Sequence, residues 1–425
     1  MAVSADTVPG RRIGLWGRVV CGDLLLTLAG CQGLAYYGQV AGGQMRLMHE
    51  RQPVDELLAD LRARVATELA PAGGDRALLL QRLAFSQALL DFAEETLTLP
   101  VGRRYRTYVA LDRPYVVWNL FAAPELSLDP NLWCYPLVGC APYRGYFDQA
   151  RAELEAGRLR DAGLETYLGG VAAYSTLGWF ADPLLSSFLR WPEPQLAQLL
   201  IHELAHGVVW VKGDVAFNES FATFVGRAGV ETWYGAQGPD PAADVYAADL
   251  ASWLRLQSLL ERLRQALAPV YRSALPEVEK MALKANLLAA ARSCYRSQLS
   301  VLGAGRHDGL MAVLNNAVLV SLGTYQDRVP AFEAMFERAH GDWPAFLGAV
   351  RALAALPQEA RAEALAREAL AHSRSADQQV ADRGDDAGAN QVECEALARH
   401  GFDGEPTGTV DDDVGGGGHG EHEGA

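Results

Sequence analysis

Residues 196–224, LAQLLIHELAHGVVWVKGDVAFNESFATF, form the stretch that decides the fold. Its first half has the apolar spacing of a helix and contains His202-Glu203-Leu204-Ala205-His206, a complete HExxH pattern. Residues four apart lie nearly above one another on a helix, so His202 and His206 can direct two imidazoles at one ion. Glu203 lies about a third of a turn away, where it can reach a water beside that ion without ligating it.

This donor set favours one zinc ion per chain, because catalytic zinc takes three protein ligands and a water. The third ligand is predicted to be Glu219, which opens a second amphipathic segment after the turn-like Lys212-Gly213-Asp214. The alternative is a pair of core histidines, each satisfied by a hydrogen bond, but that would leave several buried polar groups to pair without a metal. Asp214 is interpreted either as an acceptor that orients a histidine or as a turn residue or helix cap.

The negative charge of the chain is concentrated at its C-terminal end. Residues 373–425 hold eight Asp and five Glu against three Arg, which is −10 of the formal charge of −15. This Gly-, Asp- and Glu-rich segment has too little apolar surface to offset the entropy of ordering it, so we predict a disordered tail. No basic patch is visible, and this argues against nucleic acid as a partner.

Residues 1–31 have the organisation of an export signal, with a basic segment ahead of the largely apolar Val19–Leu28. The signal ends in Leu28-Ala29-Gly30-Cys31, which resembles the lipobox of bacterial lipoproteins. That resemblance implies that Cys31 is lipidated and anchors the protein in the cell envelope, facing the periplasm. Gln32 after it favours the outer membrane by the same analogy. The alternative is an ordinary buried N-terminal helix. No other stretch approaches the roughly 20 apolar residues of a membrane span.

The six cysteines form no CxxC pattern, so neither a thiolate metal site nor a thioredoxin-like motif is expected. Cys134 and Cys140 can pair if the protein is exported to an oxidising compartment. We expect instead two small buried thiols, which behave as apolar residues.

The remaining pattern predicts an α+β protein, mainly α with a small β-sheet packed on the active-site helix. Residues 101–147 are rich in aromatic residues and contain short β-like segments, and Gly170–Phe180 is predicted to be a strand. Pro239–Asp249 is predicted to be a loop. Apolar spacing predicts the helices Val54–Leu69, Arg76–Leu97, 148–168, Ala251–Leu267, Glu277–Leu299, Met311–Leu319, Phe332–His340 and Phe346–Leu353. A single catalytic domain is therefore expected over residues 32–372.

Several motifs in this order resemble the bacterial predicted aminopeptidases, a zinc-dependent family whose members are mostly lipoproteins. The resemblance covers nearly all of residues 28–345. It rests on the lipobox followed by QGLAYYGQ and on the segments Trp133–Phe147, Ala173–Phe180, His202–His206, Phe217–Phe224 and Asn315-Asn316-Ala317 before Tyr325. HExxH with a downstream NExxA is also similar to the gluzincin group, in which that glutamate is the third zinc ligand. The resemblance implies a zincin-like metallopeptidase domain that acts on peptides.

The hypothesis for catalysis assigns Glu203 as the general base that takes a proton from water and passes it to the leaving amine. A second hydrogen-bond donor for the oxyanion is sought in Tyr174, Tyr325 or Arg144. In similar zinc peptidases a strand upstream of the HExxH helix binds the extended substrate backbone as an added strand. This resemblance implies substrate contacts from Ala172, Ala173 and Ser175, with Arg144 as a further candidate.

Three functions are consistent with this sequence. The first is a periplasmic zinc aminopeptidase, and the second is an endopeptidase of the same fold. The third is a non-catalytic lipoprotein scaffold in which the zinc is structural. The presence of Glu203 favours an enzyme, because a structural site does not need a carboxylate next to its first histidine.

Overall fold

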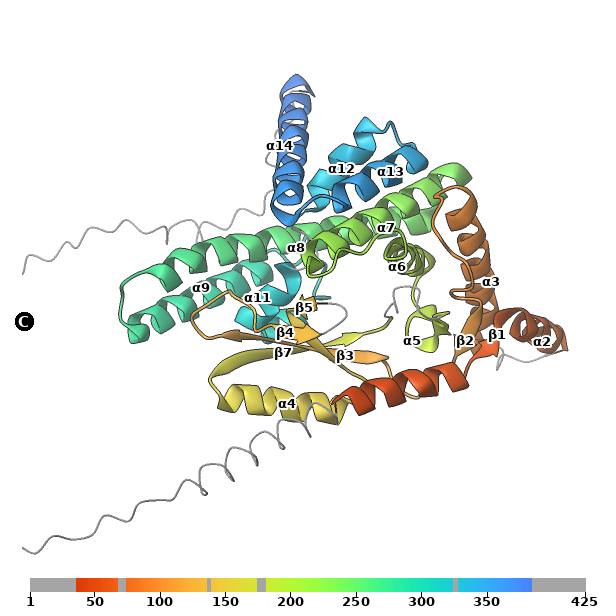
Figure 1. Ribbon diagram of the computed structural model, residues 1–425, viewed down its shortest axis with the longest axis horizontal. Coiled ribbons are helices and arrows are strands. Elements are labelled where there is room, and N and C mark those ends of the chain that lie inside the picture. The colour runs from red at the N-terminus through yellow and green to blue at the C-terminus, as the bar shows by residue number, and fades with distance from the viewer. Residues whose placement is uncertain (1–35, 68–73, 136–138, 174–180, 324–327, 384–425) are drawn as a thin grey trace, which may run out of the picture.

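The computed structural model describes residues 36–67, 74–135, 139–173, 181–323 and 328–383 (Figure 1). This part of the chain is mainly helical with small sheets, as predicted. A first helix covers residues 36–49. The other helices are α2 Val54–Thr67, α3 Gly74–Glu95, α4 Gln149–Asp161, α5 Ser186–Leu189, α6 Glu193–Ala205, α7 Val215–Gln237, α8 Pro241–Arg272, α9 Glu277–Ser297, α10 Asp308–Ala312, α11 Asn316–Gly323, α12 Val329–Arg338, α13 Trp343–Ala354 and α14 Gln358–Arg383. No helix of the described residues is long and apolar enough to cross a membrane.

The strands of the described residues form three small sheets where a single one was expected. They are β1 Gln52–Pro53, β2 Thr107–Val109, β3 Val117–Pro124, β4 Trp133–Tyr135, β5 Gly139–Ala141, β6 Tyr143–Tyr146, β7 Leu164–Val171 and β8 Leu184–Leu185. Their orders are β1-β2-β8, β6-β3-β7 and β4-β5. In the second sheet β3 is central and pairs antiparallel with both neighbours, so β7 is an edge strand.

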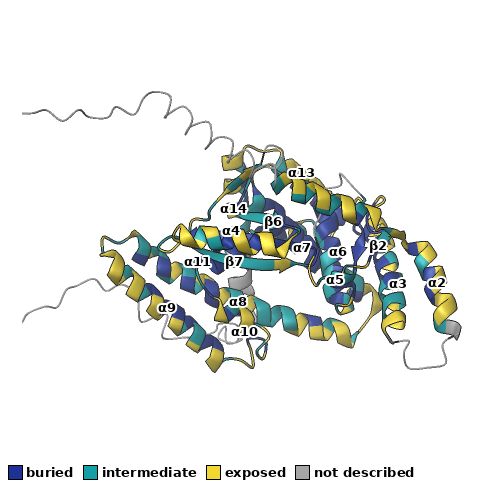
Figure 2. Cartoon of the chain, turned by 90° about the horizontal axis from the view of Figure 1, so that it is seen from below, coloured by how far each residue is buried: buried dark blue, intermediate teal, exposed yellow. Residues whose placement is uncertain are grey.

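The second sheet separates α4 from the helices that carry the HExxH motif. Alternate residues of a strand point to opposite faces. Trp118 and Leu120 of β3 therefore pack with Tyr146 against Ala152 and Ala156 of α4. The outer face of α4 is exposed, whereas α6 and α7 are largely buried at the centre of the molecule (Figure 2). The other face of the sheet is directed toward these two buried helices.

Several sequence-based assignments were wrong. The helix predicted over Met311–Leu319 is divided, since α10 ends at Ala312 and α11 begins at Asn316. The helix predicted over 148–168 ends at Asp161, because Gly163 takes a positive φ of 82° and the chain then enters β7. β7 pairs with β3 along its whole length, so the predicted strand from Gly170 contains only the last residues of β7. The loop predicted at Pro239–Asp249 is helical from Pro241, since the Asp240 side chain caps α8 and Pro241 suits the first helical position.

α14 extends beyond residue 372, the predicted end of the domain. Its helical backbone continues past Ser373, where the tail was expected to begin, to Arg383. The rest of the predicted tail, residues 384–425, and the predicted signal, residues 1–31, lie outside the described residues.

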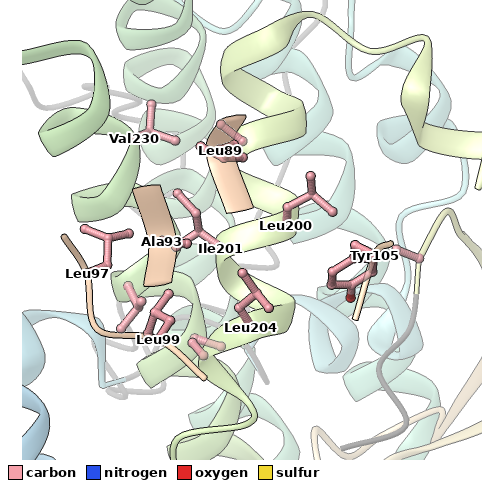
Figure 3. Close-up of a cluster of buried hydrophobic side chains, with 14 of the residues drawn as sticks. Leu89, Ala93, Leu97, Leu99, Tyr105, Leu200, Ile201, Leu204 and Val230 are labelled. Carbon is pink, nitrogen blue, oxygen red and sulfur yellow. The ribbon is translucent and has the colours of Figure 1, made fainter. Parts of the chain in front are cut away.

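α6 is held from behind by a large apolar core (Figure 3). Leu200, Ile201 and Leu204 of α6 are fully buried against Leu89 and Ala93 of α3. These three residues lie on one face of α6, because they recur at the helical period. When that face is buried in the core, the opposite face is directed away from the core. The C-terminal helices pack on the far side of α7, where Phe332 of α12 contacts the rings of Phe217 and Phe221. A second core joins α8 and α9.

Two glycines of α7 allow it to lie unusually close to α6. A Cβ on Gly226 would lie 2.9 Å from the carbonyl oxygen of Gln198 and 3.3 Å from the Cβ of His202. A Cβ on Gly229 would lie 2.9 Å from the Ile201 side chain. The two contacts at 2.9 Å are shorter than real Cβ atoms make, so a larger residue at either position requires its neighbours on α6 to shift.

Gly226→Ala is expected to destabilise the protein by about 1–3 kcal/mol, because the new methyl group meets backbone that cannot rotate away. The control is Gly235→Ala on the same helix, where nothing lies within 4 Å of the added Cβ. Alanine is the better helix former, so the control should gain about 0.5–1 kcal/mol. Urea denaturation of both variants measures the difference. Equal stabilities would show that the two helices are not in tight contact.

The hairpin of β4 and β5 is closed by a disulfide between Cys134 and Cys140, so the expectation of two free buried thiols was wrong. The hairpin packs on the turn that precedes α7, since a Cβ on Gly139 would lie 3.1 Å from the backbone nitrogen of Gly213. At a φ of 87°, Gly139 also has a backbone conformation that favours glycine. The disulfide therefore restrains one boundary of the segment that leads into α7.

Candidate active site

α6 and α7 bring the predicted metal ligands together. His202 and His206 are four residues apart at the end of α6, and their rings lie 4.9 Å apart, centre to centre. Glu219 is in the second turn of α7. Its Oε2 lies 3.4 Å from Nε2 of His202 and 3.8 Å from Nε2 of His206. One donor atom of each residue lies within 4.8 Å of the others. The side chains of His206 and Glu219 are buried, and that of His202 is 16% exposed.

This spacing fits a single small cation. Ligand atoms about 2.0–2.2 Å from a tetrahedral zinc lie roughly 3.3–3.6 Å from one another, and the two measured separations are close to that range. Burial lowers the pKa of His206 to about 4, so its imidazole is neutral near pH 7, the form that ligates metals. Burial opposes ionisation of Glu219, but the nearby imidazoles outweigh it and lower its pKa. Two imidazole nitrogens and a carboxylate match zinc well.

Glu203 lies beside this group without belonging to it. Its side chain is buried, and burial is the main reason that its pKa is raised to about 7; the charges of Glu219 and Asp182 add to the shift. The positive charges of His202 and Arg104 act against it. A carboxyl group with a pKa near 7 is well matched to accepting and returning a proton at neutral pH.

The four residues open into a cleft of about 670 Å³. The cleft is walled by α6 on one side and by the second sheet on the other. Its described lining residues are Asn119, Tyr143, Gly170, Val171, Ala172, Ala173, Trp191, Pro192, Gln195, Gln198, Leu199, His202, Glu203, His206, Trp210 and Glu219. A cleft of this size with few convergent polar groups is typical of a small-molecule or peptide site.

The structure places only some of the other predicted site residues at this cleft. Ala172 and Ala173 line it directly after β7. Tyr174, Ser175 and Tyr325 lie outside the described residues, as does the predicted lipidation site Cys31.

Arg144 lies away from the cleft. Its guanidinium is 3.9 Å from the ring centre of Tyr36, and its Nη1 is 3.9 Å from Glu155 of α4. Arg144 thus belongs to the face of β6 that packs on α4, which does not support the substrate contact expected for it.

Tyr143, the residue before Arg144, lines the cleft but was not predicted as a site residue. Neighbouring strand residues point to opposite faces, so Tyr143 enters the cleft because Arg144 faces α4. Burial raises the pKa of Tyr143, and the charges of Glu219 and Glu203 raise it further. The phenol therefore stays protonated and can donate a hydrogen bond. The sequence shows that Tyr143 and Arg144 lie on opposite faces of a strand. It does not show which of the two faces lies against the metal ligands.

Asp214 caps α7 and does not orient a histidine. Its side chain accepts a hydrogen bond from the backbone N–H of Phe217, in the first turn of α7. Its carboxylate also accepts hydrogen bonds from Arg328 at 2.7 Å and from Arg361 of α14 at 2.9 and 3.1 Å. Burial would raise the pKa of Asp214, but these two guanidinium groups outweigh it and lower the pKa. The helix that carries Glu219 is thereby tied to the C-terminal helices.

Asp214→Asn is expected to destabilise the protein by about 3–5 kcal/mol at pH 7, because two arginines lose their buried counter-ion. Asparagine still caps a helix, so the change isolates the charge. Since the folded pKa is lowered, the contribution is present above the ordinary value of 3.8 and is lost as the pH falls through the folded pKa. The difference between wild type and variant should therefore shrink below about pH 4.

The matched control is Asp148→Asn at the exposed cap of α4, where the same change should cost under about 0.5 kcal/mol. Denaturant unfolding at several pH values measures the loss of stability in each variant and the pH dependence of that loss. A pH-independent difference between Asp214→Asn and wild type would contradict the ion-pair explanation.

The family model described as "Putative aminopeptidase" matches residues 35–365, which include every described element of the cleft. No curated protein and no solved structure matches the chain. A family match over most of the chain, with the HExxH helix inside it, identifies the chain as a member of the putative aminopeptidase family.

Proposed function

We propose that this protein is a zinc metallopeptidase and that it acts as an aminopeptidase. One observation carries the proposal: two histidines and a glutamate from adjacent helices converge within 4.8 Å in a cleft that also holds Glu203. Family membership supports peptidase activity. Zinc held by His202, His206 and Glu219 would act as a Lewis acid and lower the pKa of water.

Glu203 moves the proton in this mechanism. Its carboxylate accepts a proton from the attacking water as the water oxygen bonds to the scissile carbonyl carbon. The same carboxyl group then returns the proton to the amide nitrogen, and the C–N bond breaks to release a free amine and a carboxylic acid. Its burial and its pKa near 7 suit both steps.

Tyr143 is proposed as the second hydrogen-bond donor to the oxyanion. It lines the cleft together with Glu203 and Glu219, and its phenol remains protonated at neutral pH. A donor positioned before the reaction stabilises the charge that develops on the carbonyl oxygen. Tyr174 and Tyr325 remain predictions for the same role.

Tyr143→Phe is expected to lower kcat by about 10²–10³-fold, the usual loss for one oxyanion donor, with a much smaller change in KM. Steady-state kinetics on a short peptide, with zinc content measured in parallel, tests this. The control is Tyr146→Phe, the next tyrosine on β6, which points to the α4 face. Equal activity of Tyr143→Phe and wild type would remove Tyr143 from the mechanism.

The peptide backbone is proposed to bind along the end of β7. β7 is one of the two edge strands of its sheet, and Val171, Ala172 and Ala173 line the cleft where the strand ends. An extended peptide can add to such an edge through main-chain hydrogen bonds. Small side chains at 172 and 173 leave room for it. Ser175 remains a predicted part of the same contact.

The cellular setting is also a proposal. We infer that Cys31 carries a lipid that anchors the protein in the bacterial cell envelope, facing the periplasm. The disulfide Cys134–Cys140 supports an oxidising compartment, because such bonds persist there. Peptides are the proposed substrates, and no nucleic-acid partner is proposed.

Product analysis tests the reaction. The zinc-loaded protein is incubated with a mixed peptide library beside a metal-stripped sample, and the products are read by mass spectrometry. Loss of single N-terminal residues in the zinc-loaded sample alone establishes an aminopeptidase. Internal cuts establish an endopeptidase. No cleavage by zinc-loaded protein would leave the non-catalytic scaffold as the explanation.

A further inference from the structure

The first helix, residues 36–49, packs on the protein with one face and exposes the other. Tyr36 packs against the cluster between α4 and the second sheet, and Leu47 is buried in the large core. Between them, the side chain of Gln39 accepts a hydrogen bond from the backbone N–H of Phe147 at 3.0 Å. These inner positions lie on one side of a helix, so they fix which side of it faces outward.

The outer face of this helix is apolar. The side chains of Tyr37 and Met45 are 50% and 71% exposed, and Ala41, midway between them, is exposed as well. Residues four apart are neighbours on a helix surface, so these three form one strip. A single exposed apolar residue is ordinary on a protein surface, but a continuous apolar strip indicates an interaction surface.

α4 extends this surface. In Figure 1 the first helix and α4 follow one another along the lower edge of the molecule. Ala152 and Ala156 of α4 are buried in the same cluster as Tyr36, so both helices cover the same side of the second sheet. Leu154 lies between these alanines in sequence, so it points away from the sheet, and it is 75% exposed. We call Tyr37, Ala41, Met45 and Leu154 the docking face.

The charge around the docking face fits a phospholipid surface. Residues 36–49 contain no Asp or Glu, and Arg46 is exposed beside Met45. α4 has three Arg against two Glu and one Asp, so it carries no net negative charge, although the whole chain has a formal charge of −15. Anionic lipid head groups attract a basic side chain and repel acidic ones. A helix with an apolar strip and a basic flank can lie in the plane of the membrane interface.

The proposed lipid would hold this face close to a bilayer. Cys31 precedes Tyr36 by five residues, and five residues of extended chain span at most about 18 Å. A short tether gives the helix a high effective concentration at the surface, so a weak contact is enough to hold it there. A second copy of this chain fits less well, because a stable dimer buries about 800 Å² on each partner, and three large apolar side chains along one edge do not supply such a patch.

We propose that the docking face lies on the membrane that holds the Cys31 lipid and fixes the orientation of the protein there. The second sheet then separates the bilayer from the metal group, because α4 and the cleft lie on opposite sides of that sheet. Peptides reach the cleft from the aqueous side. This inference rests on the proposed lipid for its anchor, but it does not depend on the proposed peptidase reaction.

The test places a fluorescent probe on the docking face of the full-length protein. Met45→Cys is labelled with a polarity-sensitive dye and mixed with vesicles of equal parts phosphatidylethanolamine and phosphatidylglycerol, with or without nitroxide-labelled acyl chains. The nitroxide should lower the emission by about twofold or more, because an interfacial helix buries its apolar face about 5–10 Å below the head groups.

The matched control is Leu370→Cys on α14, which lies at the opposite edge of the molecule in Figure 1 and is 58% exposed. Its emission should not change with the nitroxide. Wild type treated with the same dye gives the background from the native cysteines.

Substitutions at Gly42 change the contact without disturbing the fold. Gly42 is exposed beside Ala41, and nothing lies within 4 Å of a Cβ added there. In labelled Met45→Cys, adding Gly42→Asp should reduce the quenching by about half or more, because the new carboxylate faces anionic lipid. Adding Gly42→Leu should keep or increase the quenching. Thermal unfolding in solution should be the same for the two Gly42 variants within a few degrees, whereas a structural role for this face would separate them.

Mass spectrometry of the N-terminal peptide, which detects a lipid on Cys31, separates the docking face from the anchor. A lipid on Cys31 without quenching at position 45 overturns the docking face and keeps the anchor. Quenching at position 45 without a lipid keeps the docking face and overturns the anchor, and the absence of both overturns both. Equal quenching at positions 45 and 370 overturns the fixed orientation. Cross-linking of position 45 to a second copy, without quenching, shows that the face is a dimer interface and overturns membrane docking.

Discussion

Replacing Glu203 by glutamine is expected to lower kcat by about 10²–10⁴-fold, while zinc affinity stays within a few-fold of wild type. Glutamine has nearly the same shape but cannot accept a proton from water. Glu203 lies in the cleft beside the ligand group His202, His206 and Glu219 but is not part of it. The loss should therefore fall on the chemical step, seen as equal decreases in kcat and kcat/KM.

The metal-free protein offers a second readout for Glu203→Gln. Because the folded pKa of Glu203 is raised from 4.5 to about 7, its contribution to stability is present below pH 4.5 and is lost as the pH rises to about 7. Stability of metal-free wild type should decrease over that range relative to Glu203→Gln. Thermal unfolding between pH 5 and 8 measures it.

The control for both experiments is Glu153→Gln on α4, which removes an exposed carboxylate whose partner is Gln149. Its kinetics and its pH profile should match wild type. If Glu203→Gln kept full activity with zinc bound, the general base would be another group. If wild type and Glu203→Gln were both inactive with zinc bound, the metal group would have a structural role only.

Replacing Glu219 by glutamine is expected to weaken zinc binding by about 100-fold or more. The carboxylate lies between the two imidazoles, 3.4 and 3.8 Å from their Nε2 atoms, and it supplies the negative charge of the proposed site. A neutral amide is a much poorer zinc ligand. Affinity is measured by competition with a chromogenic chelator, and activity at limiting zinc should fall in parallel.

Metal removal should have a matching effect on stability. A ligand that binds only the folded state stabilises it by about 4 kcal/mol when its concentration is a thousand times the dissociation constant. Wild type should therefore lose about that much on chelation. At the same zinc concentration, a 100-fold weaker Glu219→Gln should show a zinc-dependent gain smaller by about 2.7 kcal/mol.

The control is Glu231→Gln, three turns further along α7 on an exposed position, which should bind zinc like wild type. Wild-type affinity in Glu219→Gln would show that Glu219 is not a ligand, and the two histidines would then need another partner.

The geometry of HExxH follows from local sequence. Two histidines four residues apart on a helix must lie on one face, whatever surrounds them. The apolar residues Leu200, Ile201 and Leu204 recur at the helical period, and all three are fully buried. The mainly helical composition and the short strands of residues 101–147 follow from the same periodic patterns.

Longer-range features were harder to predict. The helix predicted over residues 148–168 continued into the first residues of β7, whose conformation is decided by pairing with β3. Segments of ambiguous propensity take the structure that their partners supply, and the residues that pair with β7 lie 40 to 54 positions earlier in the chain.

The sequence by itself determined how the two histidines and the neighbouring glutamate are arranged on their helix, because an α-helix imposes their relative positions. Only the tertiary structure decided that Gly226 and Gly229 let α7 approach closely enough to bring Glu219 to them. It also decided that Tyr143 faces the cleft while Arg144 faces α4. Strand alternation is local, but which face meets the active site depends on packing between distant segments.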